Sequence, residues 1–224
     1  MGVAVAGLNT RRNWLLDSQL VLYVPFWDSR MKGSPIISQD IYSHSCSVTG
    51  AIWTPQGRYF DGVDDYINIP DAPSLNPTNA ITIMEWINPT SFGTDYTCPL
   101  GKGGNEQWYF RLGTASQLIS FQMNKQTEDV WRSVEHPTAL VAGTWYHLVA
   151  TYDGATIAIY LNTVKATNSV TGAIGVSADS LCIANLNTTT WYFNGSIGEA
   201  RIYNRALTAG EVMNDYLATK WRYQ

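Results

Sequence analysis

Hydrophobic and polar residues alternate with a period of two over most of the chain beyond residue 20. The clearest example is "TWYHLVATYDG" (144–154), which is followed directly by "ATIAIYLN" (155–162). Strict alternation of this kind is typical of half-buried β-strands. The Asp153-Gly154 dipeptide between the two runs favours the tight turn that joins antiparallel strands, so the stretch predicts a β-hairpin.

Further strands are predicted by short runs that lie between clusters of Gly, Pro, Asn, Asp and Ser. These runs are "DYINIP" (65–70), "AITIMEWINP" (80–89), "WYFRLG" (108–113), "QLISFQMN" (117–124), "SLCIANL" (180–186) and "GSIGEARIYN" (195–204). Many short strands with turn signals at a spacing of roughly 8–12 residues are typical of an all-β sandwich or barrel.

One helix is predicted near the C-terminus, over "LTAGEVMNDYLATKW" (207–221). Thr208 and Glu211 have the spacing of a capping box, in which the two residues satisfy each other's backbone N–H groups at the first turn. Apolar side chains then recur at helical spacing, and this stripe is expected to lie on the sandwich. The stripe consists of Val212, Tyr216, Leu217 and Trp221.

The predicted domain organisation is simple. Residues 1–19 are expected to form an N-terminal arm, either mobile or docked on a neighbouring molecule. Residues 20–224 are expected to form one β-sandwich domain that includes the helix. Of the 224 residues, 45% are hydrophobic and 14% are charged, so the chain can bury a full core.

The net charge and the aromatic content of the chain bear on what kind of partner the protein binds. The formal net charge is −4, which argues against a nucleic-acid partner because phosphate neutralisation needs clustered Lys and Arg. The nine tryptophans and thirteen tyrosines exceed what a core of this size requires. Some aromatic rings are therefore expected at the surface, where their flat faces bind sugars or protein partners.

Cysteine usage and the N-terminal residues bear on location. Cys46, Cys98 and Cys182 are widely separated, so buried thiols are expected, with one long-range disulfide as the alternative. The apolar run in "MGVAVAGLNTRR" is too short for a signal peptide, and no stretch approaches transmembrane length, so membrane insertion is not expected. An extracellular or virion-surface location would require a leader outside this sequence or release by cell lysis.

Four ordered stretches resemble the laminin-G-like, concanavalin A-like lectin/glucanase superfamily over about residues 20–215. They are "FDGVDDYINIPDAPSLNPTNAITIMEWINPTSF" (60–92), "LGKGGNEQWYFRLG" (100–113), "GTWYHLVATYDGATIAIYLN" (143–162) and "FNGSIGEARIYNRALTAGEV" (193–212). The resemblance implies a concanavalin A-like jelly-roll sandwich of two antiparallel sheets, which agrees with the strand pattern and adds a short C-terminal helix.

The same resemblance implies a calcium site. Its first and last strands pair side by side, which would bring "YFDG" close to "SIGEARIYN" and Asp61 close to Glu199. Calcium takes six to eight oxygen ligands, so turns rich in Asp, Asn and Gly suit it. The expected side-chain ligands for Ca²⁺ are Asp61, Asp64 and Glu199.

An alternative for these carboxylates is purely structural. Asp64 and Asp65 would form an Asx-type turn, and Glu199 would pair with Arg201 or Arg205. Many relatives carry an acidic residue immediately before the glutamate of the last strand, where this chain has Gly198. A weak calcium site, or none, is therefore a second expectation.

Catalytic residues are not predicted. Glycosidases need two carboxylates about 5–10 Å apart, and the glucanases of this superfamily carry theirs in an E-x-D-x-x-E arrangement that is not found here. Glu85 lies alone in "TIMEWI", on the face that carries Ile81, Ile83 and Ile87. It is expected either to pair with an arginine or to lie at a sheet edge.

The candidate ligand-binding residues are aromatic and amide side chains outside the predicted strands: Trp131, Asn187, Trp191 and Tyr192. Aromatic rings stack on the C–H faces of sugars, and amides bind their hydroxyl groups. Each aromatic residue alone is more often a packing residue, because its side chain buries so much area.

Three functions remain open. The first is a non-catalytic adhesive module that recognises a glycan or cell-surface polysaccharide, with or without calcium. The second is a structural or decoration protein of a phage or virus particle, whose partners are other copies of itself or particle proteins. A glycan-degrading enzyme is third, since the carboxylate pair is missing. An exposed aromatic residue beside open Asn or Asp groups would favour the first.

Overall fold

Two antiparallel sheets form the protein in the computed structural model, which describes residues 17–93, 96–103, 107–124, 131–186 and 190–224. The first sheet has the order β14 (Val164–Ser169), β13 (Thr156–Leu161), β12 (Tyr146–Tyr152), β7 (Ile81–Pro89), β16 (Asn194–Tyr203), β5 (Gly57–Asp61) and β4 (Ile52–Thr54), and β1 (Leu20–Val24) also pairs with β16. The second has the order β11 (Trp131–Glu135), β10 (Ile119–Asn124), β9 (Trp108–Leu112), β8 (Leu100–Lys102), β15 (Leu181–Ile183), β6 (Tyr66–Ile69), β3 (Ser45–Thr49) and β2 (Ile36–Ile37).

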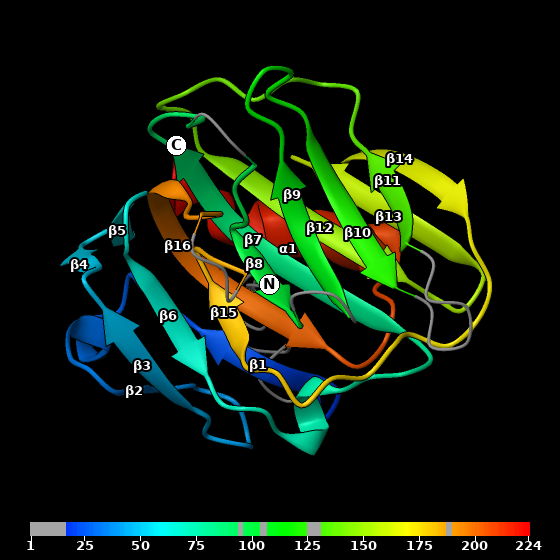
Figure 1. Cartoon of the computed structure of the whole chain (residues 1–224), viewed down its shortest axis with the longest axis horizontal. Helices are drawn as coiled ribbons and strands as arrows, with labels where there is room; N and C mark the ends of the chain where they lie inside the picture. Colours follow the sequence, from blue (N-terminus) through cyan, green and yellow to red (C-terminus); the bar gives the residue numbers. More distant parts are fainter. Residues whose placement is uncertain (1–16, 94–95, 104–106, 125–130, 187–189) are drawn as a thin grey trace, which may run out of the picture.

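The layers of the molecule follow from these sheets. In Figure 1 the second sheet lies in front of the first, and the single α-helix of the described residues, α1 (Ala209–Thr219), lies behind both. Three 3-10 turns complete the described elements: η2 (Ser29–Lys32), η3 (Pro73–Leu75) and η4 (Lys220–Arg222). The predicted all-β sandwich with a short C-terminal helix is confirmed.

The core lies between the two sheets and is built by alternation. Phe60, Ile83 and Ile197 of the first sheet meet Phe110 and Phe121 of the second, and each is fully buried. Burial of one such side chain stabilises the fold by about 1.5–3 kcal/mol relative to its exposure. The residues between them in sequence point to the outer face of each sheet, and α1 covers part of that face on the first sheet.

The predicted hairpin is present as β12 and β13, paired from Leu148–Leu161 to Tyr152–Ile157. Its turn is closed by Asp153, whose Oδ1 atom accepts N–H groups from Ala155 and Thr156 at 2.9 and 2.7 Å. The expected pairing of "YFDG" with the last strand is also confirmed, since β5 pairs with β16 from Arg58–Ile197 to Asp61–Asn194.

The capping box of α1 is confirmed, but its predicted apolar stripe is wrong in part. Glu211 donates its backbone N–H to the Thr208 side chain, and its carboxylate accepts the Thr208 N–H. Leu217 and Trp221 are 51% and 58% exposed. The buried side chains are instead Val212, Asp215 and Thr219, because α1 packs on a polar outer face of the first sheet that contains His147 and Arg201.

The remaining expectations concern thiols, termini and membranes. Cys46, Cys98 and Cys182 are buried and form no disulfide. Residues 1–16 of the predicted arm lie outside the described residues, whereas Asp17 bonds to Arg205 at 2.6 Å. Among the described helices, none is long and apolar enough to cross a membrane.

Candidate functional site

Four aromatic side chains gather on the outer face of the second sheet, and we call Tyr96, Tyr109, Trp131 and Trp191 the aromatic face. Tyr109 lies between Trp108 and Phe110, which point into the core, so its own ring points outward. The rest of the face comes from the first residue of β11 and from two connecting segments. The outer side of this sheet faces the viewer in Figure 1.

Edge contacts hold these rings together. The centroid of Tyr109 lies 5.1 Å from Trp131, with an interplanar angle of 66°, and 5.7 Å from Trp191, at 61°. Trp191 also meets Tyr96 at 5.7 Å and 62°. T-shaped pairs at these separations are favourable because the positive ring edge meets the negative ring face. The arrangement leaves Trp131 and Trp191 partly exposed and Tyr96 41% exposed.

Polar groups adjoin the rings. Ser120, Gln122 and Asn124 of β10 lie on the same side of the sheet as Tyr109 and Trp131, because Gln122 pairs with Tyr109 and Asn124 pairs with Trp131. Gln122 donates an N–H to Ser120 at 3.0 Å. Burial raises the pKa of Tyr109, so its phenol stays neutral at physiological pH. Ser120, Gln122 and Asn124 are buried, at 2%, 6% and 4% exposure, so the accessible part of the face is the ring surface of its tryptophans and of Tyr96.

One cation completes the face. The guanidinium carbon of Arg111 lies 4.5 Å from the centroid of the Tyr96 ring. Arg111 is partly exposed on β9, and no carboxylate among the described residues lies within ion-pair distance of it. Its fork of N–H donors remains available to an anionic group.

Among the predicted ligand-binding residues that the structure describes, Trp131 and Trp191 come together. Trp131 and Trp191 both contact Tyr109, although 60 positions separate them in the chain. The ring of Tyr192 lies 6.5 Å from that of Tyr66. Asn187 lies outside the described residues.

Sequence reasoning missed Tyr96, Tyr109 and Arg111. The signal for two of them was present, since alternation in "WYFRLG" places Tyr109 and Arg111 on the side of the strand opposite Trp108 and Phe110.

The aspartates of "FDGVDD" form a compact turn. One carboxylate oxygen each of Asp61, Asp64 and Asp65 lies within 4.8 Å of the others. Asp61 Oδ1 accepts the N–H groups of Val63 and Asp64 at 2.8 and 3.4 Å, and Asp65 Oδ2 accepts the Asp61 N–H at 2.9 Å. Burial raises the pKa of Asp65. The Asx-type turn is therefore formed by Asp61 and not by Asp64 and Asp65, which were the residues expected to form it in the alternative.

Glu199 does not meet Asp61, so that expectation is wrong. Asp61 aligns with Asn194 at the start of β16, whereas Glu199 lies five residues further on and aligns with Trp86 of β7. The Glu199 carboxylate is buried, lies 2.5 Å from Arg201 and accepts the Trp27 indole N–H at 2.9 Å. The predicted trio of calcium ligands therefore does not fit this arrangement, and calcium binding at Asp61 and Asp64 stays a prediction.

Glu85 contradicts its prediction too. It lies in β7, between β12 and β16, and so is not at a sheet edge. Its side chain shares the core face with Ile83 and Ile87 and is fully buried, and neither carboxylate oxygen has a hydrogen-bond partner. This burial raises the pKa of Glu85 well above the ordinary value of 4.5. Burial therefore favours the neutral form of this carboxyl group over the charged form.

The two antiparallel sheets form a β-sandwich. The profile of the family described as "Concanavalin A-like lectin/glucanases superfamily" matches residues 61–213. The chain belongs to this superfamily. Comparison with curated protein sequences finds no match.

Solved structures with the same fold include binding domains of toxins. The binding domain of Paraclostridial Mosquitocidal Protein 1 is 16% identical, with a TM-score of 0.70 over 88% of this chain and 52% of that one. The botulinum neurotoxin serotype D ligand-binding domain in complex with N-acetylneuraminic acid is 9% identical, with a TM-score of 0.71 over 90% and 51%. The botulinum neurotoxin DC binding domain in complex with rat synaptotagmin II is 14% identical, with a TM-score of 0.66 over 89% and 51%.

This chain spans about half the length of these neighbours. At identities this low the comparison shows a shared fold, and the two complexes are properties of those proteins.

Proposed function

We propose that the protein is a non-catalytic recognition module that binds glycans of a cell surface or polysaccharide through its aromatic face. The observation that carries the proposal is the meeting of Trp131 and Trp191 on Tyr109, beside Gln122 and Asn124. The exposed ring surface is suited to the C–H faces of a sugar. Residues that are distant in sequence build this surface together.

The fold neighbours support this class of function. They are binding domains of toxins, and their printed complexes include a sialic acid and a receptor protein. Because these proteins share only the fold with this chain, they favour surface recognition in general and name no particular glycan. In this proposal the protein acts outside the cell or on the surface of a particle.

The environments of Glu85 in β7 and Glu199 in β16 favour binding over hydrolysis. A glycosidase needs two acids facing one cleft, about 5–10 Å apart. Glu85 is closed into the core, and Glu199 is buried and neutralised by Arg201. Neither side chain is accessible to a saccharide.

Alanine substitution of the two tryptophans tests the proposal. Glycan-array screening of the wild type identifies a ligand, and calorimetric titration then compares Trp131→Ala and Trp191→Ala with the matched control Trp221→Ala, which removes an exposed tryptophan of η4. Loss of a central aromatic contact costs about 2 kcal/mol or more, so affinity is expected to fall about thirtyfold in the first two variants and to stay unchanged in the control.

The competing function is assembly into a particle through contacts with other copies of the chain or with particle proteins. No glycan binding, combined with a concentration-dependent oligomer in light scattering, would replace the recognition proposal with that one. Glycan binding that all three variants retain would place the site elsewhere on the protein.

A further inference from the structure

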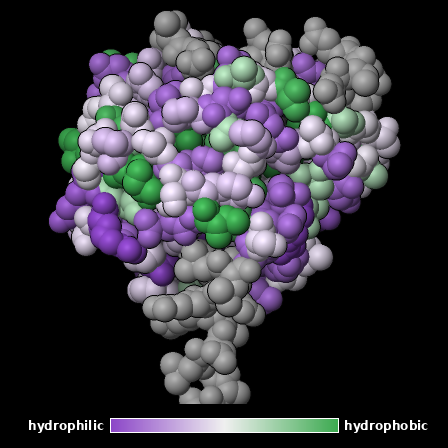
Figure 2. All heavy atoms as spheres, turned by 90° about the horizontal axis from the view of Figure 1, so that it is seen from below, coloured by the Kyte–Doolittle hydropathy of each residue, from purple (hydrophilic) through white to green (hydrophobic). Residues whose placement is uncertain are grey.

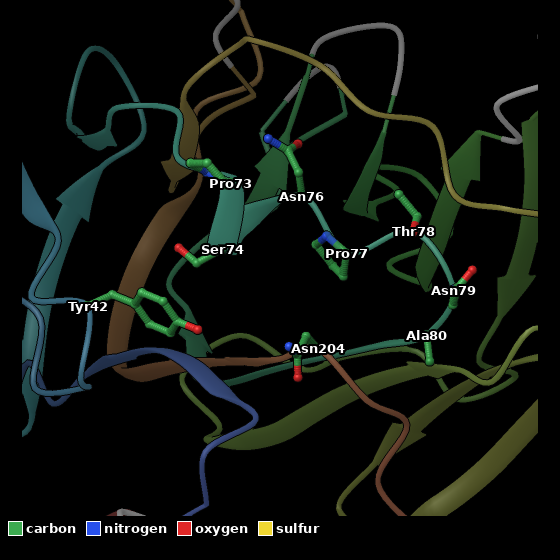
Figure 3. A pocket seen from close by; sticks show the side chains of 9 residues that line it. All are labelled: Tyr42, Pro73, Ser74, Asn76, Pro77, Thr78, Asn79, Ala80 and Asn204. Carbon is green, nitrogen blue, oxygen red and sulfur yellow. The ribbon is translucent and has the colours of Figure 1, made fainter.

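A second concave site lies at the end of the sandwich that carries η3. A groove of about 510 Å³ forms where three distant segments meet: the loop with Tyr42, the stretch from Ser74 to Ala80, and Asn204 directly after β16. In Figure 3, Tyr42 points into this groove from one side, Asn204 lies along its base, and Pro77 to Ala80 form the other side. We call it the Tyr42 groove. It shares no residue with the aromatic face.

The ring of Tyr42 is held in place although it is 45% exposed. Asp40 Oδ1 accepts the backbone N–H groups of Tyr42 and Ser43 at 2.8 and 3.2 Å, which fixes the loop as an Asx turn. The ring stacks on His44, with centroids 5.8 Å apart and an interplanar angle of 18°. An exposed aromatic ring that is already ordered loses little conformational entropy when a ligand packs against it.

Amide groups in the groove are available for hydrogen bonds. Asn79 and Asn204 are exposed, and among the described residues their side chains and the Tyr42 hydroxyl have no hydrogen-bond partner. Asn76 differs, because its amide donates to Asp71 at 2.8 Å and accepts from Gln107 at 2.5 Å. Asn76 thus supports the wall, while Asn79 and Asn204 can bind a ligand.

The groove is electrically neutral. Its lining contains tyrosine, proline, serine, asparagine, threonine and alanine, and no carboxylate, amine or guanidinium group. Figure 2 views the molecule from below, and the face it shows is mostly hydrophilic with separate hydrophobic patches. An uncharged lining that mixes polar and apolar surface fits an uncharged polyhydroxylated ligand, which has both hydroxyl groups and C–H faces, better than an ion.

Ser74 of the groove lining does not form a catalytic pair with the neighbouring His44. His44 Nε2 lies 3.1 Å from the carbonyl oxygen of Val21 and 3.2 Å from Ser74 Oγ. A carbonyl only accepts, so Nε2 must carry the proton and donate it. Because a protonated Nε2 cannot take a proton from Ser74, this histidine does not activate the serine, and the groove is suited to binding alone.

From this geometry we propose that the Tyr42 groove is a second ligand site that binds a neutral saccharide unit. One C–H face of the sugar ring packs on Tyr42, and its hydroxyl groups bond to the side-chain amides of Asn79 and Asn204. The volume lies within the range of about 300–1,000 Å³ that is usual for small-molecule sites.

The test uses nuclear magnetic resonance of the full chain labelled with ¹⁵N. Glucose, galactose, mannose and N-acetylglucosamine, each as monomer and short oligomer, are titrated while the side-chain NH₂ signals of Asn79 and Asn204 are followed. At least one sugar is expected to shift both signals with saturation, and Tyr42→Ala is expected to weaken that binding at least tenfold. The matched control is Ile41→Ala, which removes the neighbouring 72%-exposed side chain that does not line the groove.

Two results would overturn the proposal: no sugar of the panel moves these signals, or Tyr42→Ala binds as the wild type does. Trp131→Ala separates the two sites, because the Asn79 and Asn204 shifts are expected to persist in it. If Trp131→Ala keeps the Asn79 and Asn204 shifts but loses glycan binding at the aromatic face, the Tyr42 groove is confirmed as a separate site.

Discussion

His147 and Asp215 form a buried contact, 3.2 Å between Nε2 and Oδ2, that joins β12 to α1. Arg201 of β16 bonds to the other oxygen of Asp215, and its Nη2 lies 2.5 Å from Glu199. The helix is therefore fastened to the first sheet by a buried ionic network that accompanies its apolar contacts. Beside this network, the Trp86 ring stacks on Tyr216 and Tyr223, with centroids 5.8 and 4.5 Å apart.

Asp215→Asn is expected to destabilise the protein by about 3–5 kcal/mol at pH 7, because it leaves the buried Arg201 charge without one of its partners. Urea unfolding measures this change. Asn214→Ala, at an exposed position of the same helix, is the control and is expected to stay within about 0.5 kcal/mol of wild type. Equal stability of Asp215→Asn and the control would contradict a stabilising role for the network.

The pH dependence of this contact follows from the pKa of Asp215. Burial acts to raise that pKa, but the charge of Arg201 and the hydrogen bond from His147 outweigh it, so the pKa lies below its ordinary value of 3.8. The stabilisation by Asp215 is complete above that value and is lost as the pH falls through the lowered native pKa. Wild type is therefore expected to lose stability in acid more steeply than Asp215→Asn.

Glu85 is expected to produce the opposite dependence. Burial raises its pKa, so the unfolded chain releases a proton that the folded chain keeps. Stability is lost as the pH rises from about 4.5 towards the native pKa, by up to about 1.4 kcal/mol per pH unit. Glu85→Gln removes this contribution, so its advantage over wild type in urea unfolding is expected to grow between pH 5 and pH 8. A difference that does not change with pH would show that the carboxyl is not buried as described.

Period-two alternation was sufficient to predict an all-β sandwich or barrel, because most strands have one face in a core and one face outside it. The family resemblance then selected the sandwich of two antiparallel sheets. The capping box was equally predictable, since Thr208 and Glu211 are local partners. The identity of the buried residues of α1 was not predictable from the sequence. Apolar spacing pointed to Leu217 and Trp221, whereas the polar surface beneath the helix selects Asp215, and that surface is built from strands more than ten residues away.

For the candidate site too, the residue types were predictable from the sequence, but the contacts between distant segments were not. Trp131 and Trp191 were identifiable as aromatic residues near loops, but their meeting depends on Tyr109, which belongs to a third segment. Glu199 was assigned to Asp61 from strand order alone. The order of strands in a sheet does not give their register. Glu199 lies five residues beyond Asn194, the residue of β16 that aligns with Asp61, so its carboxylate lies beside Arg201 and not beside the Asp61 turn.

Calcium dependence, predicted from the sequence, is expected to run through Asp61 and Asp64 and not through Glu199. Thermal unfolding with excess calcium and with chelator measures it as a difference in Tm. Asp61→Asn keeps an oxygen to accept the turn N–H groups but weakens calcium ligation, so the difference is expected to disappear. Asp153→Asn is the matched control, because Asp153 also accepts two backbone N–H groups in a turn. No difference in wild type would leave "FDGVDD" as a turn only.

Arg111 is expected to make the aromatic face prefer acidic sugars. Its guanidinium lies against Tyr96 without an ion-paired carboxylate among the described residues, so a sialic or uronic acid that packs on the rings can place its carboxylate there. A charge-assisted hydrogen bond contributes about 1.5 kcal/mol or more, which corresponds to about a tenfold preference over the neutral analogue.

Calorimetric titration of matched acidic and neutral oligosaccharides checks this preference. Arg111→Gln is expected to remove it while leaving neutral binding within about twofold, and added salt is expected to weaken only the acidic ligand. Arg132→Gln makes the same change in net charge on the residue after Trp131, whose side chain alternates to the other side of β11, and is expected to retain the preference. If both variants lose it equally, the preference arises from the overall charge of the protein and not from Arg111.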